Sequence, residues 1–333
     1  MQMGEVSLLV WGLTILGVVL IFVLDFYTVT RTPHVVGMGE AARWSIFYIA
    51  LATAFGLGVL YFNGSQAGTE FFAAYLVEKS LSVDNLFVFA IILAQFAVPS
   101  ELQQRVLLIG IAMALVMRAI FIAIGAAALS AFAFTFVIFG ALLIWTGIQL
   151  ARHRNEDPDP SDNLLVRQVR KRYPFTDAYH GTAMFIREKG KRVATPMLLV
   201  IVAIGSTDLL FALDSIPATF GVTQSPYLVF TANAFALFGL RALYFLIKGL
   251  LDRLIYLSLG LAAILVFIGV KLILTWAHET WSEVPKIPTM LSLVVIAVIL
   301  TIATVASLVK SRQDPSLTAH AGRVTKHDPG ADA

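Results

Sequence analysis

Long apolar runs separated by short polar connections dominate the pattern along this chain. A helix that crosses a membrane needs about 20 mostly apolar residues. The segments that meet this requirement are approximately residues 6–24, 44–62, 71–98, 105–126, 131–150, 196–222, 227–247, 254–275 and 288–309. The first run lacks a preceding basic stretch and a following small-residue cleavage site, so we interpret it as a retained helix. The pattern therefore predicts an all-α, polytopic membrane helix bundle with about nine transmembrane helices.

The composition supports lipid as the solvent of this chain. Hydrophobic residues make up 58% of it and charged residues 14%, whereas a soluble domain carries roughly a quarter charged residues. Its net charge of +3 comes from basic residues in connections between apolar runs, which is a membrane-topology pattern and not a nucleic-acid interface. The absence of Cys excludes thiolate metal ligands, disulfides and cysteine catalysis. With no phosphate-binding Gly motif and no Ser/His/Asp arrangement, we expect neither an enzyme nor a tightly bound cofactor.

Lys and Arg residues occur in alternate connections, which sets the expected orientation. The connections rich in them are residues 25–43, 151–195, 248–253 and the tail 310–333. The connections 63–70, 127–130 and 223–226 have none, and the connection 276–287 has only Lys286. In a nine-helix arrangement all basic connections fall on one side. We therefore expect an outside N-terminus, a transmembrane domain over residues 1–309, and a disordered cytoplasmic tail over residues 310–333.

Two of the expected helices carry matched pairs of acids. Glu78 and Asp84 lie in the third helix, and Asp208 and Asp214 lie in the sixth. Both pairs are six residues apart, and corresponding acids are offset by 130 positions (208 − 78 and 214 − 84). The next helices continue the match with Arg118 and Arg241, which are offset by 123 (241 − 118).

The match predicts an internal repeat of three helices. Gly147 in the fifth helix corresponds to Gly269 in the eighth, with an offset of 122 (269 − 147). The two copies cover about residues 71–150 and 196–276, with the basic connection 151–195 between them. Because three is an odd number, the copies must cross the membrane in opposite directions. Inverted repeats of this kind recur in secondary transporters, which bind substrate at the repeat interface.

Acids at membrane depth need partners, because each costs about 2.5–3.5 kcal/mol at a helix centre. We expect them to converge on a cation. The candidate ligands are Glu78, Asp84, Asn85, Asp208, Asp214 and Ser215, with Arg118 and Arg241 balancing their charge. All histidines fall in connections or the tail, so the ligand set is oxygen, which suits Mn²⁺, Mg²⁺ or Ca²⁺. The alternative is a structural ion-pair network that pins the bundle.

Helix geometry restricts how these acids meet. Six residues rotate a helix by about 600°, which leaves the two acids of each pair about 120° apart and about 9 Å along the axis. Either they form successive stations of a path, or their helices are locally unwound. Pro217 favours unwinding of the sixth helix beside Asp214, because proline lacks an amide donor.

The sequence around these acids resembles the TerC family of membrane proteins. The resemblance is carried by residues 71–85, 211–218 and 231–244, and it extends from about Trp11 to Val309, whereas the tail beyond Lys310 is individual to this chain. It implies a bacterial inner-membrane protein of a family named for tellurium resistance and linked to manganese export and metal homeostasis. It also implies a role for the acids at positions 78, 84, 208 and 214. Some members carry a redox-modulator name, for which this cysteine-free sequence offers no direct chemistry.

We therefore expect a transporter that exports Mn²⁺, or a similar hard divalent ion, in exchange for protons. Its expected partners are the divalent metal ion and the lipid bilayer but no nucleic acid, and the sequence leaves its oligomeric state open. One alternative is a non-transporting membrane scaffold in metal or tellurium stress, with an ion-pair core and the basic connection as its docking surface. Another is an anion carrier that uses Arg118 and Arg241. A tellurium oxyanion would avoid four carboxylates because it is negative.

Overall fold

The chain folds into a bundle of long helices, as the apolar pattern predicts. The computed structural model describes residues 6–31, 36–152, 164–176, 178–188, 191–247, 254–281, 283–285 and 287–313. The helices are α1 Leu8–Arg31, α2 Met38–Gln95, α3 Ser100–Ala131, α4 Thr135–Arg152, α5 Leu164–Arg172, α6 Pro196–Phe220, α7 Pro226–Phe238, α8 Leu240–Ile247, α9 Leu257–Thr280 and α10 Thr289–Gln313. The strands β1 Phe185–Glu188 and β2 Lys191–Ala194 form a small antiparallel hairpin. The all-α class is confirmed, and the expected disordered tail falls almost wholly in residues 314–333, outside the described residues.

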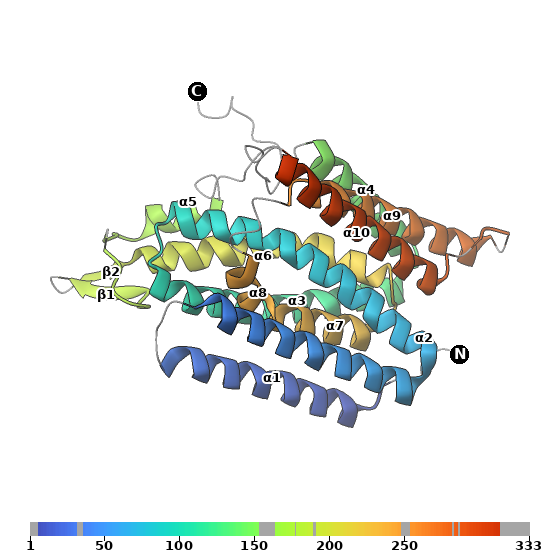
Figure 1. Ribbon diagram of the computed structural model, residues 1–333, viewed down its shortest axis with the longest axis horizontal. Helices are drawn as coiled ribbons and strands as arrows, with labels where there is room; N and C mark the ends of the chain where they lie inside the picture. The colour runs from blue at the N-terminus through green and yellow to red at the C-terminus, as the bar shows by residue number, and fades with distance from the viewer. Residues whose placement is uncertain are drawn as a thin grey trace.

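Helix α2 contains two membrane crossings folded against each other at Gly64. Its 58 residues would measure about 87 Å as a straight helix, far more than the roughly 30 Å of a bilayer core. Gly64 has φ 87° and ψ 173°, a conformation that glycine adopts without steric cost. The halves fold back closely, since a Cβ on Gly68 would lie 2.7 Å from the Leu60 Cβ. Figure 1 shows them as a blue and a cyan helix that meet at this turn.

This fold agrees with the expected number of membrane crossings. In the described part of the chain, eight helical segments are long and apolar enough to cross a membrane, and α7 with α8 forms one of them. Because α2 is long enough for two crossings, the segments accommodate nine. Apolar side chains cover the outward faces of α1 and α10, as helices in contact with lipid require.

The helical breaks differ from those that the sequence suggests. Helix α6 continues through Pro217 to Phe220, so the expected unwinding there is wrong. Bonds around the proline keep the turn closed: Thr219 Oγ1 donates to the Ser215 carbonyl at 2.8 Å, and the Gly221 amide donates to the Pro217 carbonyl at 2.9 Å.

The seventh crossing is interrupted instead at Gly239, between α7 and α8. Beside this break, the Lys79 ammonium donates a hydrogen bond of 3.1 Å to the Ala236 carbonyl in the last turn of α7. A cation at a helix C-terminus is favourable because the unpaired carbonyls carry partial negative charge. Lys79 therefore stabilises the end of α7 from the neighbouring helix α2.

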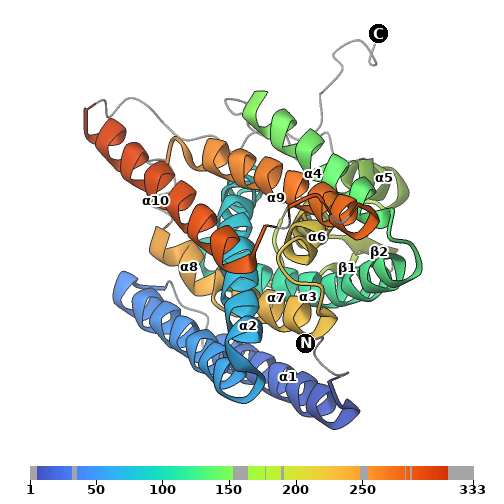
Figure 2. The ribbon, with the colours of Figure 1, turned by 90° about the vertical axis from the view of Figure 1, so that its right-hand side faces the viewer.

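The helices form two groups around a central pair. Helices α4, α9 and α10 lie together on one side, and α1 lies beside the first half of α2 on the opposite side (Figures 1 and 2). Helix α6 and the second half of α2 pack together between them. Arrays of buried residues from α2, α3, α6 and α7 make up most of the core. The matched acids lie on the two central helices.

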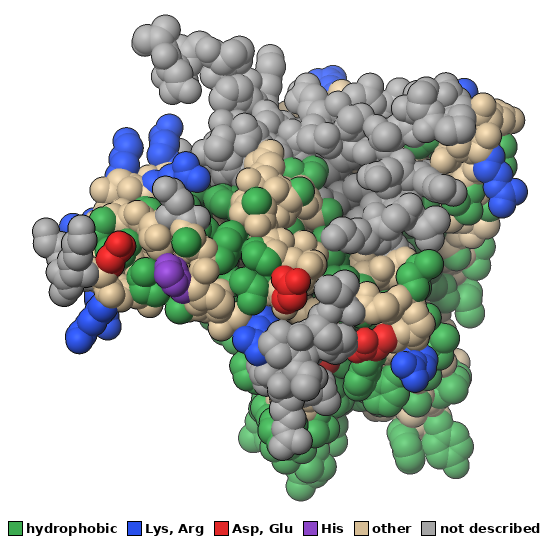
Figure 3. All heavy atoms as spheres, turned by 60° about the vertical axis from the view of Figure 1, so that its left-hand side comes forward, with side chains coloured by type: hydrophobic (Ala, Val, Ile, Leu, Met, Phe, Trp, Pro, Cys, Tyr) green, Lys and Arg blue, Asp and Glu red, His purple; other side chains and the backbone are tan. Residues whose placement is uncertain are grey.

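The described residues of the basic connection, 164–176, 178–188 and 191–195, lie at one end of the bundle (Figure 1). Helix α5 packs on α6, and Figure 3, which turns this end toward the viewer, shows Lys and Arg side chains around it and hydrophobic surface below. Tyr179 ties the connection to the bundle, since its hydroxyl donates to the Phe96 carbonyl at 2.7 Å. Burial raises the pKa of Tyr179 to about 12, so the hydroxyl stays protonated and able to donate.

Candidate metal site

Two of the predicted acids meet at one arginine in the centre of the bundle. The Arg118 guanidinium, from α3, forms ion pairs with Glu78 of α2 and with Asp208 of α6. Its Nη2 atom donates to Asp208 Oδ1 at 3.2 Å. All three side chains are at most 2% exposed. The cluster joins three helices from both of the expected repeats. It holds two carboxylates, Glu78 and Asp208, but only one positively charged group, the Arg118 guanidinium.

Polar side chains extend this cluster along one face of α6. Asp208, Ser215 and Thr219 are spaced by seven and four residues, which places them on the same side of a helix. The Thr219 hydroxyl shares its single proton between the Ser215 carbonyl at 2.8 Å and Glu78 Oε2 at 3.2 Å. Thr219 is not among the residues predicted from the sequence, although its spacing of eleven residues from Asp208 (219 − 208) could have indicated it.

The contact between α2 and α6, along which Glu78 and Thr219 meet, is called the seam. Several buried oxygens along this seam have no hydrogen-bond partner within the described residues. They are Asp208 Oδ2, Ser82 Oγ and Ser215 Oγ. Ser82 lies one turn after Glu78 on α2, and Ser215 one turn before Thr219 on α6. Because buried polar atoms are normally paired, these oxygens are available to bind a cation or water. Asn85 is also buried in α2, whereas the side chain of Asp84 lies outside the described residues.

Asp214 belongs to a separate place on the other side of α6. Thr146 of α4 donates to Asp214 Oδ1 at 2.9 Å, and the carboxylate is only partly buried. Asp208 and Asp214 therefore face different neighbours, α3 and α4, as their spacing predicts. Among the described His, Asp and Glu side chains, no three lie close enough to hold a metal ion. Of the matched acids whose side chains are described, Glu78 and Asp208 lie together and Asp214 lies apart, so they do not form one closed ligand shell.

The second arginine does not neutralise the matched acids. Arg241 of α8 pairs with Asp25 of α1 at 2.6 Å and donates to Gln104 Oε1 at 3.0 Å. The expected role of Arg241 beside the four acids is therefore wrong in this arrangement. Asp25 directly follows the first apolar run, yet only 5% of its side chain is exposed. A sequence search for acids within apolar runs passes over Asp25, because it follows the first run.

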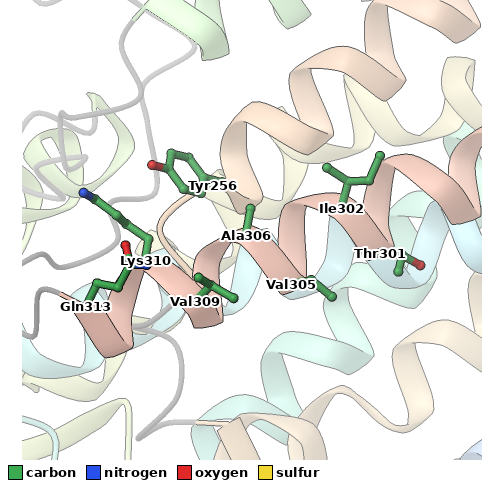
Figure 4. Close-up of a pocket in the computed structure, with 8 residues that line it drawn as sticks. All are labelled: Tyr256, Thr301, Ile302, Val305, Ala306, Val309, Lys310 and Gln313. Atoms are coloured by element: carbon green, nitrogen blue, oxygen red, sulfur yellow. The ribbon is translucent and has the colours of Figure 1, made fainter.

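A groove on the outer face of α10 lies apart from this chemistry. It is lined mostly by apolar residues of α10 together with Tyr256 and Lys310 (Figure 4). None of its lining residues belongs to the clusters around Arg118, Asp214 or Arg241. The groove is a feature of the surface of α10 and not a candidate for the cation site.

Together these features define an integral membrane protein with several membrane-spanning helices and a buried, charged cluster at its centre. The profile described as the integral membrane protein TerC family matches residues 63–315. The chain belongs to the TerC family. The match begins at the turn of α2, so α1 and the first half of α2 lie before it.

Curated relatives are similar over most of their length. The chain is 41% identical over 314 residues to an uncharacterised membrane protein of Myxococcus xanthus, covering 94% of this chain and 96% of the relative. It is 46% identical over 275 residues to one of Mycobacterium tuberculosis, covering 81% and 69%. It is 38% identical over 275 residues to an Escherichia coli protein named as a proposed membrane-bound redox modulator, Alx, covering 80% and 86%. No solved structure matches the chain.

Proposed function

We propose that this protein is a transporter that exports a hard divalent cation, with Mn²⁺ as the first candidate, across the bacterial inner membrane. The observation that carries the proposal is the buried cluster in which Glu78 and Asp208 share Arg118. Two carboxylates and one guanidinium leave one net negative charge (−2 + 1) inside the bundle. Such a charge is costly in a membrane protein and is typical of an ion pathway.

Arg118 has a defined part in this mechanism. While no metal is bound, its guanidinium neutralises Glu78 and Asp208. An entering divalent cation competes with Arg118 for the same carboxylates, and the unpaired oxygens of Ser82 and Ser215 add neutral ligands. The cation and the arginine cannot both be fully bonded, so binding favours a second arrangement of the helices. Protons that return to the carboxylates release the metal on the other side.

The contact between α4 and α9 supports the inverted repeat on which alternating access would depend. A Cβ on Gly140 would lie 2.6 Å from the Gly269 carbonyl oxygen, and one on Gly147 would lie 2.8 Å from the Ala262 carbonyl oxygen. In the repeat, 140 corresponds to 262 and 147 to 269, with the same offset (262 − 140 and 269 − 147). Each contact is therefore the counterpart of the other, which is what a two-fold axis between antiparallel copies produces.

The experiment is uptake of radiolabelled Mn²⁺ into proteoliposomes that hold the purified protein. We expect uptake by the wild type and its loss in Asp208→Asn and Asp214→Asn, with melting temperatures close to that of the wild type. Glu101→Gln is the matched control, because Glu101 is an exposed carboxylate in the first turn of α3. Wild-type protein that moves neither Mn²⁺, Mg²⁺ nor Ca²⁺ would refute the proposal.

A non-transporting scaffold is the second candidate, and a specific observation favours it. Glu78 and Asp208 are already paired with Arg118, as they would be in a structural ion-pair core. A scaffold predicts silent wild-type vesicles and acid variants that lose stability. The anion-carrier alternative gains no support from Arg118, because its guanidinium faces two carboxylates.

A further inference from the structure

A second carboxylate–threonine contact lies on the same seam, between the central cluster and the Gly64 turn of α2. Thr219 donates to Glu78 at 3.2 Å, and Thr223 donates to Glu70 Oε2 at 2.7 Å. Thr223 follows Thr219 by one helical turn, since its amide donates to the Thr219 carbonyl at 3.1 Å. On α2, Glu70 precedes Glu78 by eight residues, or about 12 Å along a helix. The seam therefore carries two carboxylate stations in succession.

Glu70 has neutral partners and no basic one within the described residues. Besides Thr223, the Gln66 amide Nε2 donates to Glu70 Oε1 at 3.1 Å. The connections 63–70, 127–130 and 223–226, which lie at the same end of the bundle, contain no Lys or Arg, and the connection 276–287 contains only Lys286, which lies outside the described residues. Among the residues that the structure describes, no cation neighbours the Glu70 carboxylate, in contrast to Glu78, which pairs with Arg118.

Unpaired oxygens continue the seam on the other side of the Glu78 station. Ser82 Oγ and Ser215 Oγ have no hydrogen-bond partner in the described structure and are at most 1% exposed. The order along the seam is Asp208, then the two serines, then Glu78 with Thr219, and then Glu70 with Thr223. Every group in this order offers oxygen, which is the ligand type that hard divalent cations prefer.

We propose that Glu70, Gln66 and Thr223 form an external cation station, through which the exported metal leaves the central Glu78–Asp208 cluster. This inference rests on the proposed function and adds an exit site to it. The carboxylate of Glu70 attracts the cation. The Thr223 hydroxyl and the Gln66 amide, which donate to Glu70 now, turn their oxygens to the metal when it arrives.

The competing explanation is a structural tie between the outer ends of α2 and α6. Both explanations predict that the contact matters for stability, so stability alone does not distinguish them. They differ in what metal on the outer side does. A cation station is occupied by metal from that side and then blocks exit, whereas a structural tie is indifferent to it.

The experiment uses inside-out membrane vesicles, in which export appears as uptake and the vesicle lumen represents the outside. Mn²⁺ uptake is measured at increasing Mn²⁺ concentrations in the bath, which represents the cytoplasm. It is then measured again with increasing Mn²⁺ preloaded in the lumen. The variants are Glu70→Gln, Thr223→Val and Thr223→Ser. Glu283→Gln is the matched control, because Glu283 is an exposed carboxylate in the connection between α9 and α10, on the same expected side. Melting temperatures report on the fold.

We expect Glu70→Gln and Thr223→Val to lower the maximal rate and to raise the half-inhibitory lumenal Mn²⁺ concentration, each by about tenfold. The KM for Mn²⁺ in the bath stays within about twofold of the wild-type value, because the entry path and the central site are intact. Thr223→Ser keeps the hydroxyl and behaves as the wild type, as does Glu283→Gln.

Three results would overturn the external station while the proposed function stands. The first is an unchanged lumenal inhibition in an active Glu70→Gln variant. The second is an equal change in Glu283→Gln, which would indicate a general surface-charge effect. The third is unfolding of both Glu70→Gln and Thr223→Val while Thr223→Ser stays folded, which would indicate a structural tie. A silent wild type would instead refute the transport function itself.

Discussion

Arg241 Nη2 and Asp25 Oδ1 form an ion pair of 2.6 Å between α8 and α1, with both side chains about 95% buried. Arg241 is the repeat counterpart of Arg118, which faces Glu78 and Asp208 instead. The two arginines therefore have different partners although their sequence surroundings match. Helix α1 lies before the region that the family profile matches, yet it supplies the partner of a buried charge.

Breaking this pair from either side should destabilise the protein strongly. Asp25→Asn or Arg241→Gln removes one member of a buried ion pair, which costs about 3–5 kcal/mol. The double variant should lose much less than the sum, because neither charge remains. Thermal unfolding in detergent measures all three. Strictly additive losses would show that the two residues are not energetically coupled.

Removing the central arginine should make stability depend on metal. Arg118→Gln leaves Glu78 and Asp208 facing each other without a cation, so its melting temperature should fall well below the wild-type value. Added Mn²⁺ should raise the melting temperature more in this variant than in the wild type, because the ion no longer competes with Arg118. A site filled at about 100 times its Kd gains about 2.7 kcal/mol. An equal response in both proteins would contradict the competition.

The contact between α4 and α9 should not tolerate a single methyl group. A Cβ on Gly269 would lie 2.7 Å from the Gly140 carbonyl oxygen, so Gly269→Ala should force the helices apart and cost about 1–3 kcal/mol. Gly58→Ala is the control, because nothing lies within 4 Å of a Cβ at that position. It should be neutral or stabilising by about 0.5–1 kcal/mol, since alanine favours helix. Chemical or thermal unfolding compares the two. An innocuous Gly269→Ala would mean that the helices are not held this closely.

The tie between Tyr179 and Phe96 should be lost in strong alkali. The folded pKa of Tyr179, about 12, is above its ordinary value of 10.0. Its contribution to stability is therefore complete below pH 10 and disappears as the pH rises toward 12. The difference in melting temperature between the wild type and Tyr179→Phe should be constant from neutral pH to about pH 10 and should shrink above it. A difference that persists at the highest pH would mean that the hydroxyl contributes only by packing.

The sequence alone determined the class of protein and where its chemistry had to lie. Apolar run lengths gave the crossings, since the bilayer fixes how many residues a helix needs. The six-residue spacing of Asp208 and Asp214 placed them on different faces, and the structure has them on different neighbours, Arg118 and Thr146. Local periodicity was sufficient for these conclusions, because a regular helix fixes the direction of every side chain.

The partner of each buried charge and the places where helices break depend on how the helices pack together. Asp25 and Arg241 are 216 residues apart, and no local pattern relates them. The seventh crossing breaks at Gly239, where Lys79 of another helix reaches the Ala236 carbonyl, whereas α6 stays helical at Pro217. The sequence shows that a proline lacks a backbone hydrogen-bond donor and that an arginine offers several side-chain donors. The helices that pack beside such a residue determine how its bonds are satisfied.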